Sequence, residues 1–158
     1  MGTATATTKL ATFLVGLGIT ASLRAQTPPP KAQTAEELAT SGLSAYAAGR
    51  YADAEAALTQ FLTGYGANPQ VKDVLPRVYP PLALSRVRLK KFDLALEAIR
   101  TFLKEHGKAA PVETLEELRF WQGICEAQAQ DYKAASATLA AFVKDFPRSA
   151  KRPEAMLL

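Results

Sequence analysis

The stretch from Tyr51 to Tyr65, YADAEAALTQFLTGY, contains the pattern that decides the fold. Its marked positions, at offsets 0, 3, 7, 10 and 11 from the first, are Tyr51, Ala54, Leu58, Phe61 and Leu62. Offsets of 3, 4 and 7 fall on one side of a helix with 3.6 residues per turn. The stretch is therefore predicted to be an amphipathic helix whose apolar stripe runs aromatic, alanine, aliphatic, phenylalanine.

The same frame occurs twice more in the chain. It returns 41 residues later and again after a further 40, at Phe92, Ala95, Ile99, Phe102 and Leu103, and at Tyr132, Ala135, Leu139, Phe142 and Val143. A period of about 40 residues with two helices per unit is typical of an α-solenoid, in which stacked neighbours build the core because no unit buries its apolar face alone. We therefore expect an all-α domain, and we expect its surface to bind another chain.

A family resemblance becomes specific within the first repeat. The pattern of small residue, turn, aromatic, alanine and two bulky residues resembles the tetratricopeptide repeat (TPR), here at Gly42, Gly49, Tyr51, Ala54, Leu58 and Phe61. The third repeat is closer still, with Pro111, Gly123, the turn at Gln130-Asp131, Tyr132-x-x-Ala135 and the ending Phe146-Pro147. The resemblance covers residues 35–158. It implies an α-solenoid of helix-turn-helix repeats, about three of them plus the start of a fourth.

Repeat boundaries follow from this frame. We expect repeats at about 35–69, 70–108 and 111–147, with a partial unit at 148–158. Thr34 and Glu37 have the spacing of a capping box and predict the start of the first helix. Because the array stops halfway through a unit, without a polar capping helix, we expect either a fragment of a longer protein or a last helix that packs on a partner.

Prolines interrupt the first helix of the second repeat. Pro76, Pro80 and Pro81 occur within VLPRVYPPLALSRVRL, and an interior proline removes a backbone hydrogen bond and clashes with the preceding turn. Either this helix begins only at Pro80–Pro81, where first-turn prolines are tolerated, or it is kinked there. The curvature of the array at this point stays open.

The first 25 residues are predicted to be a signal peptide. No acidic residue precedes Glu36, Lys9 supplies a positive charge, and Leu10–Ile19 is an apolar run too short to span a bilayer comfortably. The sequence Ser22–Ala25 offers cleavage after Ala25, and the proline-rich residues 26–34 are predicted to be a linker. The alternative is an uncleaved signal that anchors the chain in the membrane. After cleavage we expect an exported, periplasmic protein with no stable membrane insertion.

Chemistry-bearing residues are sparse. His106 is the only histidine and is expected at a helix end on the surface. Cys125 is the only cysteine, so no internal disulfide can form, and it is expected to be a small buried residue. The carboxylates are interpreted as solvated helix faces. We predict no enzymatic activity, no cofactor and no metal.

Nucleic acid is not an expected partner. The formal charge of +4 falls to +2 once Lys9 and Arg24 are removed with the signal peptide. The short basic runs at Arg86–Lys91 and Lys151–Arg152 lie beside predicted helix ends, whereas a nucleic-acid binder gathers its cations on one face with stacking aromatics.

The resemblance implies where a protein partner would bind. In the TPR family the first helix of each repeat lines the concave face, and the matching positions here are Leu43, Tyr46, Arg77, Leu84, Val87, Arg88, Phe120, Ile124 and Gln128. This face is largely apolar with two arginines, which suits an amphipathic helix or an apolar peptide. The alternative is that these residues pack on neighbouring repeats or on a second copy. Trp121 is interpreted as core between repeats.

The spacing and the repeat ends look most like those of exported bacterial TPR proteins. These include the periplasmic TPR partner of the Tol-Pal system and the TPR proteins of outer-membrane assembly. The resemblance implies a non-enzymatic adaptor of the bacterial cell envelope with an unidentified protein partner. The alternative is a structural or self-associating N-terminal segment of a longer repeat protein, without a groove of its own.

Overall fold

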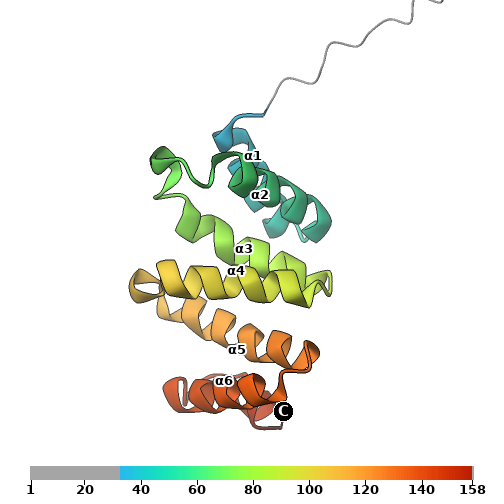
Figure 1. The fold of residues 1–158 in the computed structure, drawn as a ribbon, viewed down its shortest axis with the longest axis vertical. Coiled ribbons are helices and arrows are strands. Elements are labelled where there is room, and N and C mark those ends of the chain that lie inside the picture. The colour runs from blue at the N-terminus through green and yellow to red at the C-terminus, as the bar shows by residue number, and fades with distance from the viewer. Residues whose placement is uncertain (1–32, 158) are drawn as a thin grey trace, which may run out of the picture. The chain divides into compact units, whose positions relative to one another are not determined.

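The computed structural model describes residues 33–157, and every regular element in that range is a helix (Figure 1). The α-helices are α1 (Ala35–Ala47), α2 (Tyr51–Tyr65), α3 (Leu75–Arg88), α4 (Phe92–Glu105), α5 (Val112–Gln128), α6 (Tyr132–Asp145) and α7 (Arg152–Leu157). Two short 3₁₀ helices, η1 (Pro69–Val71) and η2 (Gly107–Ala109), lie in the connections. The all-α prediction is confirmed. The predicted signal peptide and most of the predicted linker lie outside the described residues.

Consecutive helices pair into hairpins, α1–α2, α3–α4 and α5–α6, which follow one another in Figure 1. Each hairpin packs on the next through its second helix, so α2 contacts α3, α4 contacts α5, and α6 contacts α7. The first helices also contact one another, α1 with α3 and α3 with α5. This nearest-neighbour stacking is that of a solenoid.

The turns inside the hairpins share one backbone conformation. Gly49, Lys90 and Gln130 hold equivalent positions, with φ of 73°, 58° and 62°. Glycine adopts this left-handed region without steric cost, whereas other residues are strained there. The turns lie where the sequence predicts them, although only the first carries the residue that suits it best.

Helix α1 begins at the capping box that the sequence predicts. The Glu37 amide donates to Thr34 Oγ1 at 3.2 Å, and the Thr34 amide donates to Glu37 Oε2 at 2.8 Å. The predicted capping box is therefore confirmed. The Tyr65 hydroxyl, from the end of α2, donates to the carbonyl of Gln33 at 2.8 Å and ties this start to the first hairpin.

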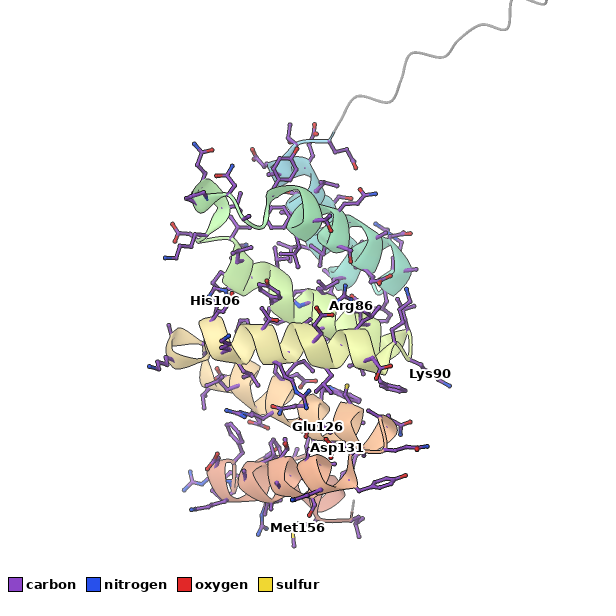
Figure 2. All side chains as sticks on the ribbon, in the orientation of Figure 1. Arg86, Lys90, His106, Glu126, Asp131 and Met156 are labelled. Carbon is purple, nitrogen blue, oxygen red and sulfur yellow. The ribbon has the colours of Figure 1, made fainter. Side chains whose placement is uncertain are left out.

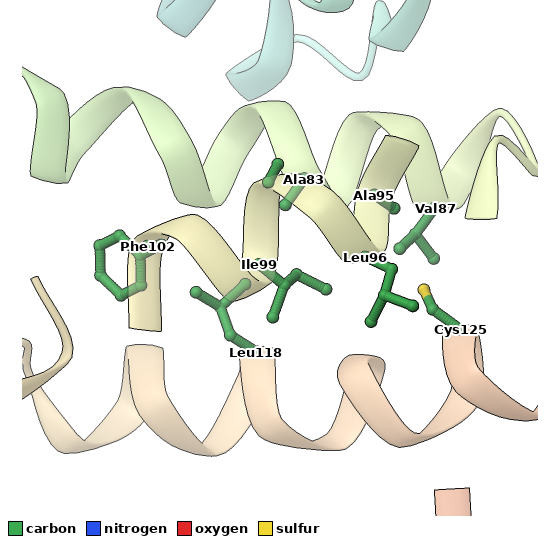
Figure 3. Close-up of a cluster of buried hydrophobic side chains, with 9 residues drawn as sticks. Ala83, Val87, Ala95, Leu96, Ile99, Phe102, Leu118 and Cys125 are labelled. Carbon is green, nitrogen blue, oxygen red and sulfur yellow. The ribbon is translucent and has the colours of Figure 1, made fainter. Parts of the chain in front are cut away.

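The buried side chains form three clusters, one at each of the two interfaces between hairpins and one where α7 packs on the third hairpin. The middle cluster joins α3, α4 and α5, where Ile99 and Leu118 have no exposed surface (Figure 3). Phe61 in the first cluster and Phe102 in the middle one are each 1% exposed. The alanine, aliphatic and phenylalanine positions of the repeating stripe are therefore core positions.

Within the first and third hairpins the two helices cross at a glycine. A Cβ added to Gly42 would lie 2.4 Å from Leu58 Cδ2, and one added to Gly123 would lie 2.5 Å from Leu139 Cδ2. The leucine of the second helix therefore fills the space that a side chain on the first helix would need. Both glycines are at the small position of the TPR pattern.

Helix α3, which contains the prolines, does not start where one of the two sequence-based expectations placed it. Helix α3 begins at Leu75 and includes Pro80 and Pro81 in its interior, so it does not begin only at the proline pair. Pro76 occupies the first turn, where the missing amide hydrogen costs little. Buried side chains on both sides of the pair, Val78 and Leu82, hold the helix in place through the interior prolines.

One residue of the repeating stripe is exposed to solvent. Tyr132 is 67% exposed, although Tyr51 and Phe92 at the equivalent positions are half-buried. The Tyr51 ring lies edge-on to Tyr46, with centroids 6.0 Å apart. In the third hairpin the residue equivalent to Tyr46 is Ala127, which offers a ring far less contact area.

Within residues 33–157, none of the helices has both the length and the apolar composition required to cross a membrane.

Candidate partner-binding face

The first helices of the hairpins, α1, α3 and α5, lie next to one another. We call the surface along these three helices the first-helix face. Leu43, Leu84 and Ile124 hold the same repeat position on it, and each is half-buried against a different core cluster. The face therefore carries a row of aliphatic side chains, each packed on one side against a core cluster and exposed to solvent on the other.

Two of the nine residues expected on this face belong to the core. Val87 is 6% exposed within the middle cluster, and Phe120 is 2% exposed in the last one. The Phe120 ring lies 5.7 Å from that of Phe142, and the Lys151 ammonium lies 6.0 Å from its centroid. The expectation that these side chains line a groove is corrected, because Val87 packs within the middle cluster and Phe120 packs against residues of α6 and α7.

The remaining polar positions of the face are accessible. Arg77, Arg88 and Gln128 are exposed, and Tyr46 is half-buried. Burial raises the pKa of Tyr46, with further contributions from Tyr51 and Glu117, while Arg88 acts in the opposite direction. Arg88 on α3 and Glu117 on α5 are therefore close enough to influence Tyr46 on α1.

Two neighbouring cavities form a groove between α3 and α5. The smaller, about 210 Å³, is lined by Pro80, Leu84, Glu113, Thr114, Glu117 and Leu118. The larger, about 540 Å³, is lined by Pro76, Arg77, Pro80, Pro81, Phe102, Glu105, His106, Lys108, Ala109, Ala110, Pro111 and Thr114. Pro80 and Thr114 line both, so the cavities adjoin. We call this feature the α3–α5 groove.

The groove changes character along its length. Its larger part carries two cations, Arg77 and Lys108, against one carboxylate, Glu105, whereas Glu113 and Glu117 line its smaller part. Most of the remaining lining is apolar. The groove thus offers an apolar floor with a basic end and an acidic end, which can orient an extended partner.

Glu117 is held by its neighbours. The Trp121 indole donates to Glu117 Oε1 at 2.7 Å, and Lys151 pairs with Oε2 of the same carboxylate. Trp121 is half-buried and packs against both the middle and the last core clusters, as expected for a residue between repeats. The acidic end of the groove is therefore built on a rigid support.

His106 is not the surface residue that the sequence predicts. It caps the C-terminal end of α4, and its ring packs between Tyr79 and Phe102 with centroids 5.9 and 5.8 Å away. The side chain is 15% exposed, and Nε2 is buried without a hydrogen-bond partner in residues 33–157. Figure 2 shows His106 and Lys90 at opposite ends of the α3–α4 hairpin.

Glu126 is the functional-looking residue that the sequence interpretation missed. Expected on a solvated face, it is 2% exposed on α5 (Figure 2). Its carboxylate accepts hydrogen bonds from Arg100 at 3.0 Å, Gln122 at 2.9 Å and Thr138 at 2.7 Å. The network joins α4, α5 and α6, and its full pairing identifies it as structural.

A comparison of equivalent positions in the three repeats could have predicted this network from the sequence. Glu126 and Arg86 hold the position three residues after the small residue of their repeats, where the first repeat has the buried Ala45. Arg86 donates to Thr59 at 3.3 Å, and Thr59 is equivalent to Arg100. The side chain at this position therefore contacts the preceding hairpin in both repeats. It is a cation in the second repeat, Arg86, and an anion in the third, Glu126.

Cys125 is not placed to act as a nucleophile. Cys125 has no exposed surface, and burial raises the pKa of its thiol to about 12, with Glu126 adding to the shift. A thiol with that pKa is not a nucleophile at neutral pH. No group of three or more metal-ligating side chains occurs within residues 33–157.

Comparisons with known proteins agree with this architecture. Among solved structures, the chain is similar to the Arabidopsis OM64 TPR domain, with a TM-score of 0.57 and 18% identity, over 77% of this chain and 90% of that chain. At that identity the likeness shows the fold. No curated protein sequence matches. The family model described as tetratricopeptide repeat matches residues 40–73 and 81–150, which is more than half of the chain. The chain belongs to the tetratricopeptide repeat family.

Proposed function

We propose that this protein is a non-enzymatic adaptor that binds an extended or helical segment of a partner protein in the α3–α5 groove. TPR domains mediate protein–protein interactions and are typically scaffolds without catalysis. One observation carries the choice of site, namely that two cavities adjoin at Pro80 and Thr114. The groove combines an apolar floor with separated charges, which is how peptide-binding surfaces obtain both affinity and orientation.

We further propose that the protein works in the bacterial cell envelope, like the exported TPR proteins that its repeat spacing resembles. The support for this lies in the sequence of residues 1–25, with its single lysine, apolar run and alanine-ending cleavage site. The mass of the protein purified from its native host tests the proposal. A chain that starts at Gln26 agrees with export, and a chain that retains residues 1–25 contradicts cleavage.

A cross-linking experiment tests the groove. A photoreactive amino acid replaces Leu84, which lines the smaller cavity, and the captured peptides are sequenced by mass spectrometry. The control carries the same group at Lys104, on the exposed side of α4. The adaptor proposal expects a distinct protein to be captured from Leu84 and not from Lys104.

A blocking variant makes the result specific. Thr114→Trp places a large side chain where the two cavities meet, and it should abolish capture from Leu84 without changing the melting temperature. Equal capture with and without the blocking residue would contradict binding in the groove.

The competing function is self-association or packing on further repeats. It is favoured by the exposed apolar residues of α7, where Met156 and Leu157 are 62% and 87% exposed beside a cavity of about 350 Å³ between α6 and α7. If the Leu84 probe captures only this same protein, the first-helix face is internal to an assembly and the competing function holds.

A further inference from the structure

Two residues that line the larger cavity, Pro76 and Arg77, have carbonyls that lack the amide donor four residues later in the helix. Pro80 and Pro81 have no amide hydrogen, so neither donates to the carbonyl four residues earlier, at Pro76 and Arg77. No amide from the loops or the other helices of residues 33–157 donates to these carbonyls either. All four residues line the cavity. Two acceptors without their usual donor therefore belong to residues at this cavity.

A third polar atom at the cavity is also unpaired. His106 lines the same space, and its Nε2 is buried without a hydrogen-bond partner in the described part of the chain. The nearest charged atom, Oε2 of Glu105, is 3.9 Å away, beyond hydrogen-bond distance. Because Nε2 has almost no accessible surface, His106 serves here as a reporter of binding and not as a hydrogen-bond partner of the occupant.

The rest of the lining selects for size and shape. Four proline rings, Phe102 and two alanines surround the cavity, at Pro76, Pro80, Pro81, Pro111, Phe102, Ala109 and Ala110. A volume of about 540 Å³ is within the range of small-ligand pockets. Flat proline rings pack well on an aromatic face, and the cations Arg77 and Lys108 favour the electron-rich face of such a ring.

We infer that this cavity binds an aromatic side chain with a hydrogen-bond donor, a tryptophan of the partner above all. The inference rests on the proposed function, because the tryptophan belongs to the segment bound in the α3–α5 groove. Its ring fills the space between the prolines, and its indole N–H donates to the carbonyl of Pro76 or Arg77.

Other occupants fit these groups less well. An aliphatic or phenylalanine side chain would cover the free carbonyls without pairing them, which costs the desolvation of each acceptor. A carboxylate supplies no donor and would lie against carbonyl oxygens. A lysine or arginine supplies donors, but it would meet Arg77 and Lys108 with only Glu105 in opposition.

Two isosteric probes test the donor directly. N-acetyl-tryptophanamide and its benzothienyl analogue, in which sulfur replaces the indole N–H, are titrated into tag-free protein residues 26–158. Binding is followed through the imidazole NMR signals of His106, which is the only histidine and lines the cavity. The native protein should bind the indole about tenfold more tightly than the analogue, the usual effect of one buried hydrogen bond.

A pair of variants separates the hydrogen bond from the packing. Pro80→Ala combined with Pro81→Ala supplies amides that pair with the carbonyls of Pro76 and Arg77. The double variant should therefore bind the indole and its analogue with about equal affinity. Pro76→Ala removes a proline ring of the same cavity without supplying a partner for either carbonyl, and it should keep the preference. Melting curves of each variant verify that it is folded.

The outcomes distinguish this inference from the proposed function. Equal affinity for the two probes, a preference that survives in the double variant, or no perturbation of His106 by either probe would overturn the tryptophan site. If the Leu84 cross-link still captures its partner in that event, the adaptor proposal stands without it. If the indole preference is present and the cross-link captures only this protein, the site binds a tryptophan and the groove-adaptor proposal fails.

Discussion

Gly42 shows how a single missing methyl group sets the distance between two helices. Its equivalent, Gly123, makes the same close approach to Leu139 in the third hairpin, whereas the second hairpin carries Ala83. Leu58 and Leu139 fill the vacated space and are almost fully buried. Since a packed interior yields little, an added methyl has nowhere to go.

We therefore expect Gly42→Ala to destabilise the protein by about 1–3 kcal/mol, because its Cβ would lie 2.4 Å from Leu58 Cδ2. Denaturant unfolding measures the change. Gly64→Ala is the matched control, since Gly64 also lies in a helix but has nothing within 4 Å of the added atom. That variant should be stabilised by about 0.5–1 kcal/mol through helix propensity. A neutral Gly42→Ala would mean that the hairpin adjusts its spacing.

The Glu126 network gives a second prediction about single residues. Arg100→Ala leaves the buried carboxylate without its counter-charge and should cost about 1–3 kcal/mol. Arg50 pairs with Asp53 at 3.2 Å, but both side chains are mostly exposed, so Arg50→Ala should cost less than about 0.5 kcal/mol. Similar costs for the two variants, measured by urea unfolding, would show that Glu126 gains little from Arg100.

Cys125 provides a pH-dependent prediction. Its folded pKa is about 12, above the ordinary value of 9.0, so the folded state holds the thiol proton more tightly than the unfolded state. This contribution to stability is complete below pH 9 and is lost as the pH rises from about 9 towards 12. Native protein at pH 8 should react with a thiol reagent only as fast as its core opens, whereas protein in urea reacts at once. Cys125→Ala, which has no thiol to titrate, should show a smaller fall in stability over the alkaline range.

At the scale of the elements, α3 combines good packing with poor hydrogen bonding. Its buried residues Val78 and Leu82 flank the proline pair that leaves two carbonyls unpaired. Such local deficits are retained where a ligand uses the freed groups or where packing compensates for them. The helix is therefore the element in which stability and binding are expected to oppose each other.

We predict that replacing both Pro80 and Pro81 with alanine raises the free energy of unfolding by about 2–4 kcal/mol. An interior proline costs a helix about 3 kcal/mol, and part of each gain is offset by the greater entropy of the unfolded chain. Pro76→Ala, in the first turn, should change stability by less than about 1 kcal/mol. Thermal unfolding of the three proteins is the measurement, and a destabilised double variant would show that the proline rings contribute mainly by packing.

At the scale of the described unit, each hairpin depends on its neighbours. The middle cluster joins α3, α4 and α5 and is covered on both sides, whereas the last cluster is closed only by the six-residue α7. In a quasi-one-dimensional array stability is a sum of local terms and interface terms, so the ends open first.

Amide hydrogen exchange should follow this order. We expect the slowest exchange in α4, intermediate rates in α2 and α6, and the fastest in α7. Phe61→Ala and Phe102→Ala should each lower stability by about 3–5 kcal/mol, because both side chains are 1% exposed in the core. Uniform exchange across α4 and α7 would contradict independent opening of the end.

The sequence by itself determined the repeat. A stripe recurring every 40 or 41 residues predicts the second helix of each hairpin, the turns at Gly49 and Gln130, and the burial of Phe61 and Phe102. Local helix periodicity and turn position are properties of neighbouring residues, so they can be read along the chain.

Only the tertiary structure decided which faces are covered and where the groove lies. Phe120 is buried because α7 folds over it, Glu126 is buried because partners from two other helices surround it, and His106 is held between rings of α3 and α4. The α3–α5 groove exists because stacking brings Pro80 and Thr114, from different repeats, to one place. Periodicity specifies the face of a helix, but the neighbour that packs on that face is set by long-range contacts, which a single sequence does not display.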